Sequence, residues 1–195
     1  MIRLLDIIFS FVGLVVLSPV LLLIYILIII ESKGHGFYIQ ERIGKNGQPF
    51  GLYKFRTMRI GADADGQLTI GKRDNRVTRI GYYLRRTKID ELPQLFNVLK
   101  GDMSLVGPRP EVRKYVNMYS DEQRRVLSVR PGITDYASIE YVNESELLEK
   151  ADDPDRLYIE TIMPDKIKLN MKYINHYTIS EYFKIIFKTF KSLMA

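Results

Sequence analysis

Two adjacent carboxylates, Asp90 and Glu91, are the residues whose types and spacing best suit chemistry. Apolar side chains follow them at i, i+3, i+4 and i+7 through residues 92–99, which predicts an amphipathic helix that begins at the pair and stops near Gly101. Taken alone, the pair is most simply a helix cap, because Asp is a preferred N-cap residue and the helix dipole favours Glu nearby. The same dipole would keep both groups ionised, so one carboxylate could attack phosphorus while the other held a divalent cation.

Cationic side chains approach this pair from both directions along the chain. On a strand expected over residues 50–58, Lys54 and Arg56 share one face, because strand side chains alternate with a period of two. Arg85 lies in a basic run just before the pair, and Arg109 stands between two prolines that restrict the backbone around it. These cations are either ordinary solvated surface or a clamp for the phosphate groups of a ligand.

Local patterns predict the elements that must position these residues. Residues 37–40 are typical of a short strand, and Asn46-Gly47 is a strong signal for a type I′ turn into the return strand. Residues 61–75 mix small and polar residues without periodicity, which predicts a loop that could act as a lid. The remaining patterns are mostly helical.

The first part of the chain is strongly apolar, with Asp6 the one charged residue between Leu4 and Ile30. Such a segment is long enough to cross a membrane, and a single transmembrane anchor is the default interpretation. Ser18-Pro19 near its middle weakens that default, because proline removes a helix hydrogen bond and bends the helix. A helix that breaks there and returns to the same face is the alternative, and these residues alone leave the two nearly even.

The last helical pattern carries aromatic bulk on one side and lysines on another. Phe183, Phe187 and Phe190 recur on one face, and Lys184 and Lys188 lie elsewhere on the turn. This arrangement fits a helix that lies in a membrane interface. A helix packed on the protein core explains it equally well.

Composition excludes several classes of site. The 195 residues carry a formal charge of +6 and no cysteine, which rules out a disulfide scaffold and a cysteine-ligated zinc site. With His35 and His176 as the only histidines, any metal would be a hard cation on oxygen ligands. The basic balance suits anionic partners such as phosphorylated substrates or an acidic membrane surface.

The order of motifs along the chain resembles the small monotopic phosphoglycosyl transferases, a family of bacterial sugar transferases. The resemblance runs from the N-terminus to about Thr134 and is carried by a set of ordered segments: the apolar segment with Ser18-Pro19, Gln40-Glu41-Arg42-Ile43-Gly44, Tyr53-Lys54-Phe55-Arg56-Thr57-Met58, Asp90-Glu91-Leu92-Pro93-Gln94-Leu95-Phe96-Asn97-Val98, Gly101-Asp102-Met103-Ser104, Gly107-Pro108-Arg109-Pro110 and Arg130-Pro131-Gly132-Ile133-Thr134.

The resemblance implies a fold and a reaction. The fold would be α+β and mainly helical, with a small β-hairpin, a re-entrant membrane helix over residues 1–33 broken at Ser18-Pro19, and a catalytic domain over residues 34–195 with interfacial amphipathic helices at the cytoplasmic face of the bacterial inner membrane. The reaction would move a sugar 1-phosphate from a UDP-sugar to undecaprenyl phosphate and release UMP, as the first membrane step of surface glycan assembly such as capsule or O-antigen.

The resemblance also implies roles for individual residues. Asp90 would be the nucleophile that forms a covalent phosphosugar intermediate, and Glu91 would bind Mg²⁺ beside it. The basic residues Lys54, Arg56, Arg85 and Arg109 would contact the phosphates or the nucleotide. Membrane lipids are further expected partners, a homodimer is allowed, and nucleic acid is not expected.

The chain departs from this family after Thr134. Many members continue with Gly-Leu, where this chain has Asp135-Tyr136, so the identity of the sugar does not transfer. A non-catalytic, membrane-tethered basic module that binds anionic lipids is the alternative function. A nucleic-acid-binding protein fits poorly, because the basic residues lead into a carboxylate pair and the chain opens with an apolar segment.

Overall fold

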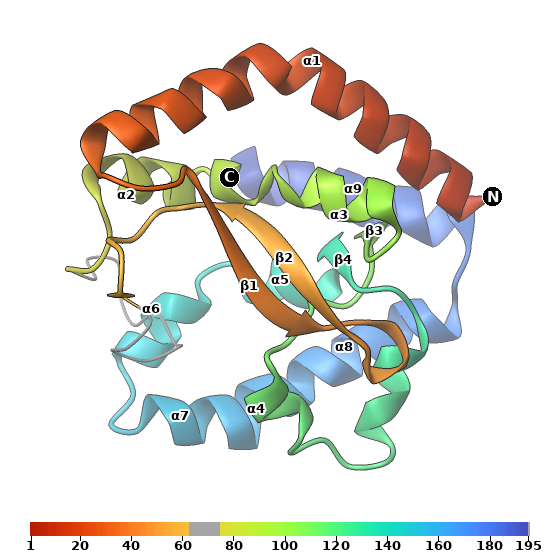
Figure 1. Ribbon diagram of the computed structural model, residues 1–195. Coiled ribbons are helices and arrows are strands. Elements are labelled where there is room, and N and C mark those ends of the chain that lie inside the picture. The colour runs from red at the N-terminus through yellow and green to blue at the C-terminus, as the bar shows by residue number, and fades with distance from the viewer. Residues whose placement is uncertain (63–74, 195) are drawn as a thin grey trace.

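The computed structural model describes residues 1–62 and 75–194, so most of the segment expected to be a lid lies outside the described residues. The architecture is mainly helical α+β, as expected, with two small sheets among helices (Figure 1). The strands are β1 (Phe37–Ile43), β2 (Pro49–Phe55), β3 (Ser104–Val106) and β4 (Gly132–Thr134). The helices are α1 (Ile2–Glu31), α2 (Arg79–Arg86), α3 (Gln94–Lys100), α4 (Arg113–Val116), α5 (Tyr136–Glu140), α6 (Glu144–Glu149), α7 (Pro154–Leu157), α8 (Met163–Asn175) and α9 (Ile179–Met194).

The N-terminal helix α1 is continuous through Pro19, and Figure 1 shows that it is bent between its two ends. Proline cannot donate to the carbonyl of Val15 four residues earlier. The hydroxyl of Ser18 donates to that carbonyl instead, at 2.8 Å. The expected break is therefore a kink whose freed carbonyl is satisfied locally, and the helix remains long and apolar enough to cross a membrane.

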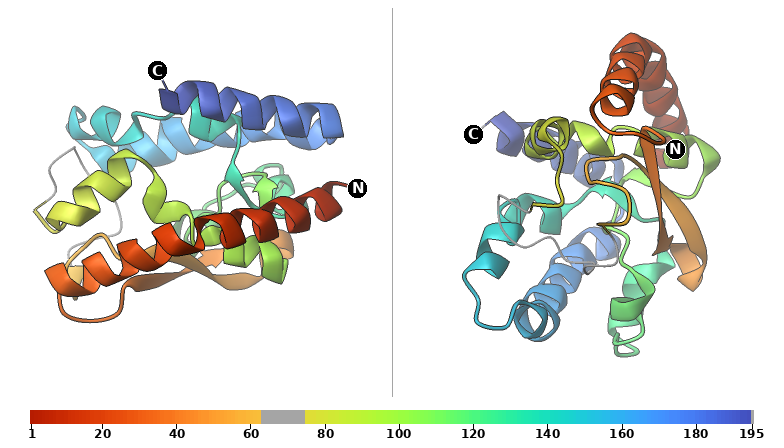
Figure 2. Two further views of the ribbon diagram at one scale, coloured as in Figure 1. Left: turned by 90° about the horizontal axis from the view of Figure 1, so that it is seen from above. Right: turned by 60° about the vertical axis from the view of Figure 1, so that its left-hand side comes forward.

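Both ends of α1 are attached to the same body of the protein. At its start, Arg3 donates to the carbonyls of Val98 and Leu99 at the end of α3, at 2.6 and 3.0 Å. At its finish, Glu31 accepts from the first two amides of α2, those of Arg79 and Ile80. Between these attachments α1 arches over α2 and α3 as a separate layer (Figure 2).

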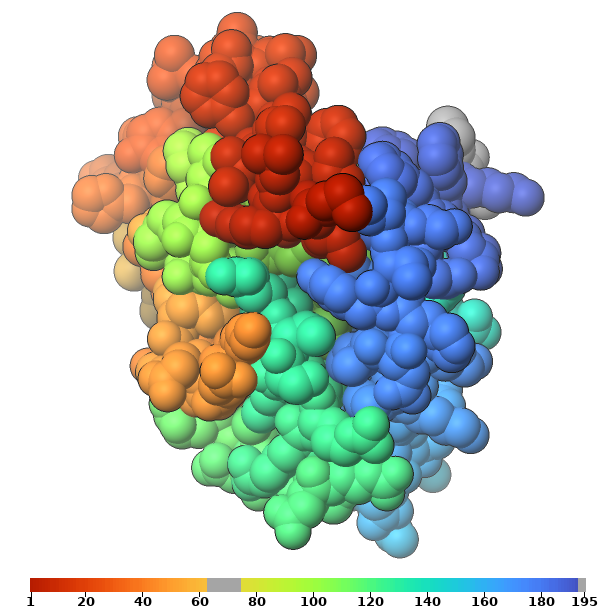
Figure 3. Space-filling view, turned by 90° about the vertical axis from the view of Figure 1, so that its right-hand side faces the viewer, coloured from red at the N-terminus to blue at the C-terminus, as the bar shows by residue number. Residues whose placement is uncertain are grey.

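Asp6 makes the most buried of the contacts that hold α1. Its side chain is buried, and its Oδ1 accepts from the hydroxyls of Ser104 and Tyr182 and from the amide of Leu105, each at 3.0 Å. A charge in an apolar helix is tolerated because three donors satisfy it. The contact joins α1 to β3 and α9. Figure 3 shows the start of the chain, in red, lying against the C-terminal part, in blue.

The hairpin forms where the sequence predicts it but with a longer connection. β1 and β2 pair antiparallel, from Phe37 opposite Phe55 to Ile43 opposite Pro49. Asn46 and Gly47 do adopt the positive φ that an Asn-Gly turn requires, at 57° and 74°. The expected two-residue turn is nevertheless wrong, because five residues connect the strands and the Gly44 amide donates to the Gln48 carbonyl across their base.

The last helix, α9, packs on the core as one of its two interpretations expected, and its membrane-interface interpretation stays a prediction. Tyr182 and Ile185 are fully buried in a cluster with Ile2 of α1. Phe187 and Phe190 stay exposed, at 72% and 60% of their surface. One face of α9 therefore packs on the core, and another presents aromatic side chains outward.

Candidate active site

Asp90 and Glu91 lie in a single 3₁₀ turn, Ile89–Glu91, ahead of α3. Lys88 just before it has a left-handed φ of 57°. No side-chain capping bond is made at the start of this turn or of α3, so the predicted helix cap is wrong. The pair is held by tertiary contacts instead.

Glu91 is the centre of a buried ion-pair cluster. Its Oε1 lies 3.1 Å from Nζ of Lys54. The guanidinium of Arg109 donates to both of its oxygens, at 3.0 Å to Oε2 and 2.5 Å to Oε1. This bidentate geometry fixes the plane of the carboxylate. Both cations were expected near the pair, and the structure brings both against Glu91.

Asp90 lies beside this cluster in a different state. Its side chain is 7% exposed, and Oδ1 is buried without a hydrogen-bond partner. Burial, and then the negative charge of Glu91, raise the pKa of Asp90 to about 6, against the opposing effect of Lys54 and Arg85. A buried oxygen without a partner is costly, so it points to a role beyond folding.

The pKa of Glu91 moves the other way. Burial acts to raise it, but Arg109 and Lys54 together outweigh burial and hold the pKa of Glu91 well below its usual range. In turn, the negative charge of Glu91 is the main cause that raises the pKa of Arg109. Two consecutive carboxylates therefore have pKa values pushed apart, a pattern common where acid and base roles are divided.

A buried asparagine brings β2 against α3 and so places Lys54 beside Glu91. The side chain of Asn97 accepts from the amide of Tyr53 at 2.9 Å and donates to the carbonyl of Gly51 at 2.7 Å. Asn97 is fully buried, whereas Phe96 of the predicted apolar stripe is 45% exposed. Asn97 stands in a motif that carries the family resemblance, but no role was expected for it; the further signal in the sequence is a polar residue within a helix of apolar periodicity.

Of the other two expected cations, Arg85 lies near Asp90, whereas Arg56 lies at the end of α1. Arg85, on α2, donates from Nε to the hydroxyl of Thr57 at 2.8 Å and contributes to the electrostatics of Asp90. Arg56 instead donates to the carbonyls of Ser32 and Lys33, at 2.7 and 2.8 Å, at the end of α1. The structure therefore does not place Arg56 with the cluster, because β2 ends at Phe55 and the period-two alternation with Lys54 ends there too.

The carboxylate oxygens of Asp90 and Glu91 suit a magnesium ion only if the substrate supplies further ligands. Among the described residues, no group of three or more His, Cys, Asp or Glu side chains comes together. Mg²⁺ commonly uses one or two carboxylates and completes its shell with water and phosphate oxygens. The unpartnered Oδ1 of Asp90 beside Glu91 fits that limited requirement, although both oxygens of Glu91 already contact cations.

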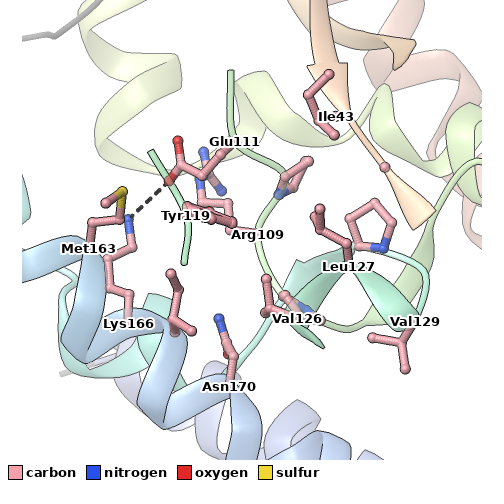
Figure 4. Close-up of a pocket in the computed structure, with 15 residues that line it drawn as sticks. Ile43, Arg109, Glu111, Tyr119, Val126, Leu127, Val129, Met163, Lys166 and Asn170 are labelled. Carbon is pink, nitrogen blue, oxygen red and sulfur yellow. Dashed lines mark ion pairs between the residues drawn. The ribbon is translucent and has the colours of Figure 1, made fainter. Parts of the chain in front are cut away.

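A small cavity of about 30 Å³ lies along the segment that carries Arg109 (Figure 4). Apolar side chains such as Val126 and Met163 make up much of its wall, and Lys166 pairs with Glu111 across 3.8 Å at its edge. This volume fits a water molecule rather than a nucleotide. The candidate site is therefore the Asp90–Glu91 cluster and not this cavity.

The fold and the site together define a mainly helical protein with a long apolar helix and a carboxylate–cation cluster suited to phosphoryl chemistry. The chain belongs to the bacterial sugar transferase family, whose model matches residues 1–195. The family resemblance expected from the sequence motifs is thus confirmed.

Several relatives match nearly the whole chain, among them the following three. A Klebsiella pneumoniae protein named UDP-glucose:undecaprenyl-phosphate glucose-1-phosphate transferase is 38% identical over 191 residues, which cover 96% of this chain and 38% of that protein. An Aeromonas hydrophila protein named UDP-N-acetylgalactosamine-undecaprenyl-phosphate N-acetylgalactosaminephosphotransferase is 36% identical, covering 97% and 43%. A Caulobacter vibrioides protein named UDP-glucose:undecaprenyl-phosphate glucose-1-phosphate transferase is 35% identical, covering 99% and 69%. The chain spans well under half the length of the first two.

Proposed function

We propose that this chain transfers a sugar 1-phosphate from a UDP-sugar to undecaprenyl phosphate and releases UMP. The names of the three relatives support the substrates and the transfer. The observation that carries the mechanism is the Asp90 carboxylate, which is buried, has an unpartnered oxygen and lies beside a cation-held Glu91. The named sugars differ between relatives, so the sugar itself is left to experiment.

The reaction proceeds in two displacements at one carboxylate. An oxygen of Asp90 attacks the β-phosphorus of the UDP-sugar, the bond from that phosphorus to the bridging oxygen breaks, and UMP leaves with the electron pair. A phosphate oxygen of undecaprenyl phosphate then attacks the same phosphorus and expels the Asp90 carboxylate. Each substrate is needed only in turn, so ping-pong kinetics follow.

The cations of the site offset the charge that opposes this attack. A carboxylate and a diphosphate repel each other, and fixed positive groups lower that repulsion. Lys54 and Arg109 are already oriented by Glu91, and Arg85 is oriented by Thr57. We place Lys54 and Arg109 at the phosphates of the UDP-sugar and Arg85 near Asp90, with no phosphate role for Arg56.

A magnesium ion belongs to the same proposal. Asp90 and Glu91 would hold it together with oxygens of the substrate phosphates. When bound, Mg²⁺ supplies charge neutralisation at the diphosphate.

The membrane arrangement rests on the two attachments of α1. A straight helix of 30 residues would be about 45 Å long and would separate its ends across a bilayer. Here both ends contact one body, through Arg3 and Asp6 at one end and Glu31 at the other. We therefore propose that residues 1–33 enter and leave the same face of the membrane. Residues 34–195 would form the catalytic domain at the cytoplasmic face, with Phe187 and Phe190 of α9 in the interface.

A UMP-release assay tests the function. The purified protein in lipid nanodiscs receives Mg²⁺ and each of a panel of UDP-sugars, first without and then with undecaprenyl phosphate. We expect a burst of one UMP per site from the donor alone with the correct sugar, and continuous release once the acceptor is added. Acid-stable label on the protein from a β-³²P-labelled donor identifies the intermediate. No release with any sugar would favour the non-catalytic, lipid-binding module instead.

A further inference from the structure

The tripeptide Pro108-Arg109-Pro110 has a single backbone hydrogen-bond donor, the amide of Arg109. Pro108 and Pro110 on either side lack an amide N–H, so only the amide of Arg109 can anchor this segment by donation. That amide donates to Oδ2 of Asp135 at 2.6 Å. The carbonyls of Pro108 and Pro110 accept from the amide of Gly132 and from Arg42, each at 3.0 Å. The contact with Asp135 is the anchor made by Arg109 itself, from which the guanidinium reaches Glu91.

Asp135 is itself fully buried and fully engaged. Its Oδ1 accepts from the amide of Ser138 and so caps α5. Its Oδ2 accepts from Arg109 and also from Nδ2 of Asn170 on α8, at 3.2 Å. The two oxygens thus divide their work: one caps a helix, and the other holds Arg109 with Asn170 fixing the orientation of the carboxylate.

We infer that Asp135 is a positioning residue for the transfer reaction, acting through Arg109. The carboxylate fixes the backbone at Arg109, and the guanidinium then presents its paired donors to Glu91 and, during the reaction, to the substrate phosphates. Asn170 supports this arrangement from α8. The inference deepens the proposed function and rests on it for the kinetic part of its test.

The competing explanation is that Asp135 merely stabilises α5. Asp135→Ser separates the two roles, since Ser is an equally good N-cap but has one oxygen and a shorter reach. We expect Asp135→Ser to keep the fold and to lower kcat for UMP release about tenfold through misplacement of Arg109. Asp153 offers a matched control, because it caps α7 by accepting from the amide of Arg156 at 3.0 Å, on the exposed surface. Asp153→Ala should leave kcat within about twofold.

A double-mutant cycle decides between positioning and stability. Arg109→Lys removes the guanidinium with its paired donors, so Asp135 has no such group left to orient in that background. Asp135→Ser should then lower kcat by no more than about twofold, because residues acting through one contact are not additive. Equal losses in the two backgrounds would overturn the inference. A loss of melting temperature alone, with kcat unchanged, would overturn it too.

A second readout separates this inference from the proposed function. Hindered rotation of the Arg109 guanidinium can be followed by ¹⁵N NMR of arginine-labelled protein, with the resonance assigned by its loss in Arg109→Lys. We expect Asp135→Ser to make the Nη signals average, and Asp153→Ala to leave them unchanged. If the wild-type protein releases no UMP with any donor, the function fails while this measurement still tests the clamp. Unchanged Nη signals in Asp135→Ser would refute it.

Discussion

Asp90 and Glu91 are consecutive residues whose carboxylates lie in opposite electrostatic environments. Burial and the charge of Glu91 raise the pKa of Asp90 to about 6. Burial acts on Glu91 in the same direction, yet Arg109 and Lys54 overcome it and lower the pKa of Glu91. The pKa of one carboxylate thus lies near 6, and the other carboxylate stays ionised as the counter-ion of Lys54 and Arg109 in this structure.

Replacing Asp90 by Asn tests the nucleophile. The change is nearly isosteric and removes the attacking charge, so we expect UMP release to fall by at least about 10³-fold. Labelling from the β-³²P donor should disappear with it. Asp155→Asn removes the same charge from an exposed pair with Lys114 and should keep full activity. Undiminished turnover in Asp90→Asn would refute the two-displacement mechanism.

The pH dependence of the reaction follows from the raised pKa of Asp90. In the proposed mechanism the ionised form of Asp90 attacks, so log(kcat/KM) for the UDP-sugar should rise with unit slope and level off near pH 6, where the pKa of Asp90 lies. Stopped UMP assays across pH 4.5–8 would measure the profile. An acid limb centred near pH 4 would mean that Asp90 is not perturbed as the structure indicates.

Because the pKa of Asp90 is raised, its ionised carboxylate destabilises the folded state at neutral pH. The folded pKa of about 6 exceeds the ordinary Asp pKa of 3.8, so the folded state binds the proton more tightly. That stabilisation is complete below about pH 4 and is lost as pH rises through 6, which costs about 3 kcal/mol at pH 7. Asp90→Asn should therefore raise the melting temperature at pH 7.5 and have little effect near pH 4. Calorimetry is the suitable method, because the chain has no tryptophan.

Much of the site was predictable because its residues carry chemistry in their types. Asp90, Glu91, Lys54 and Arg109 were all identified from the sequence, and the structure brings them together. The sequence did not indicate which residue holds the elements that carry them together. Asn97 holds β2 on α3 through two backbone contacts of Tyr53 and Gly51, and a single buried asparagine leaves no periodic signal.

The position of Arg56 and the strands β3 and β4 were not predicted correctly, because tertiary structure decides them. Arg56 was grouped with Lys54 by strand alternation, which holds only while the strand continues. The apolar helix followed from a long pattern and the fold class from the family resemblance, whereas β3 and β4 are three residues each and pair in parallel across a long sequence separation. Tertiary contacts, not local preference, decide such short strands.

The different positions of Lys54 and Arg56 give a matched pair of variants. Lys54→Met removes a cation beside Glu91 and should lower kcat/KM by about 10²-fold. Arg56→Met removes the contacts to the carbonyls of Ser32 and Lys33, so it should lower the melting temperature and leave kcat within about twofold below the transition. Equal kinetic losses in the two variants would return Arg56 to the phosphate site.

The bend at Pro19 offers a test of how α1 meets the membrane. Pro19→Leu restores the amide that can donate to the Val15 carbonyl, so the helix should straighten and its ends should separate. The chain has no cysteine, which allows single reporters in an N-terminal tag and at Lys191→Cys. In the wild-type protein, a maleimide that cannot cross the inner membrane should reach neither reporter from the periplasmic side. In Pro19→Leu it should reach the N-terminal one.

Ser18→Ala is the matched control for this change. It removes only the hydroxyl that donates to Val15 at 2.8 Å, so the bend should persist with a loss of about 1 kcal/mol in stability. If Pro19→Leu keeps both reporters protected, the kink is not what returns the chain to its starting face. The polar attachments at the two ends, Asp6 with Tyr182 and Glu31 with α2, would then be sufficient to hold it. Periplasmic labelling of the wild-type N-terminus would instead establish a true span.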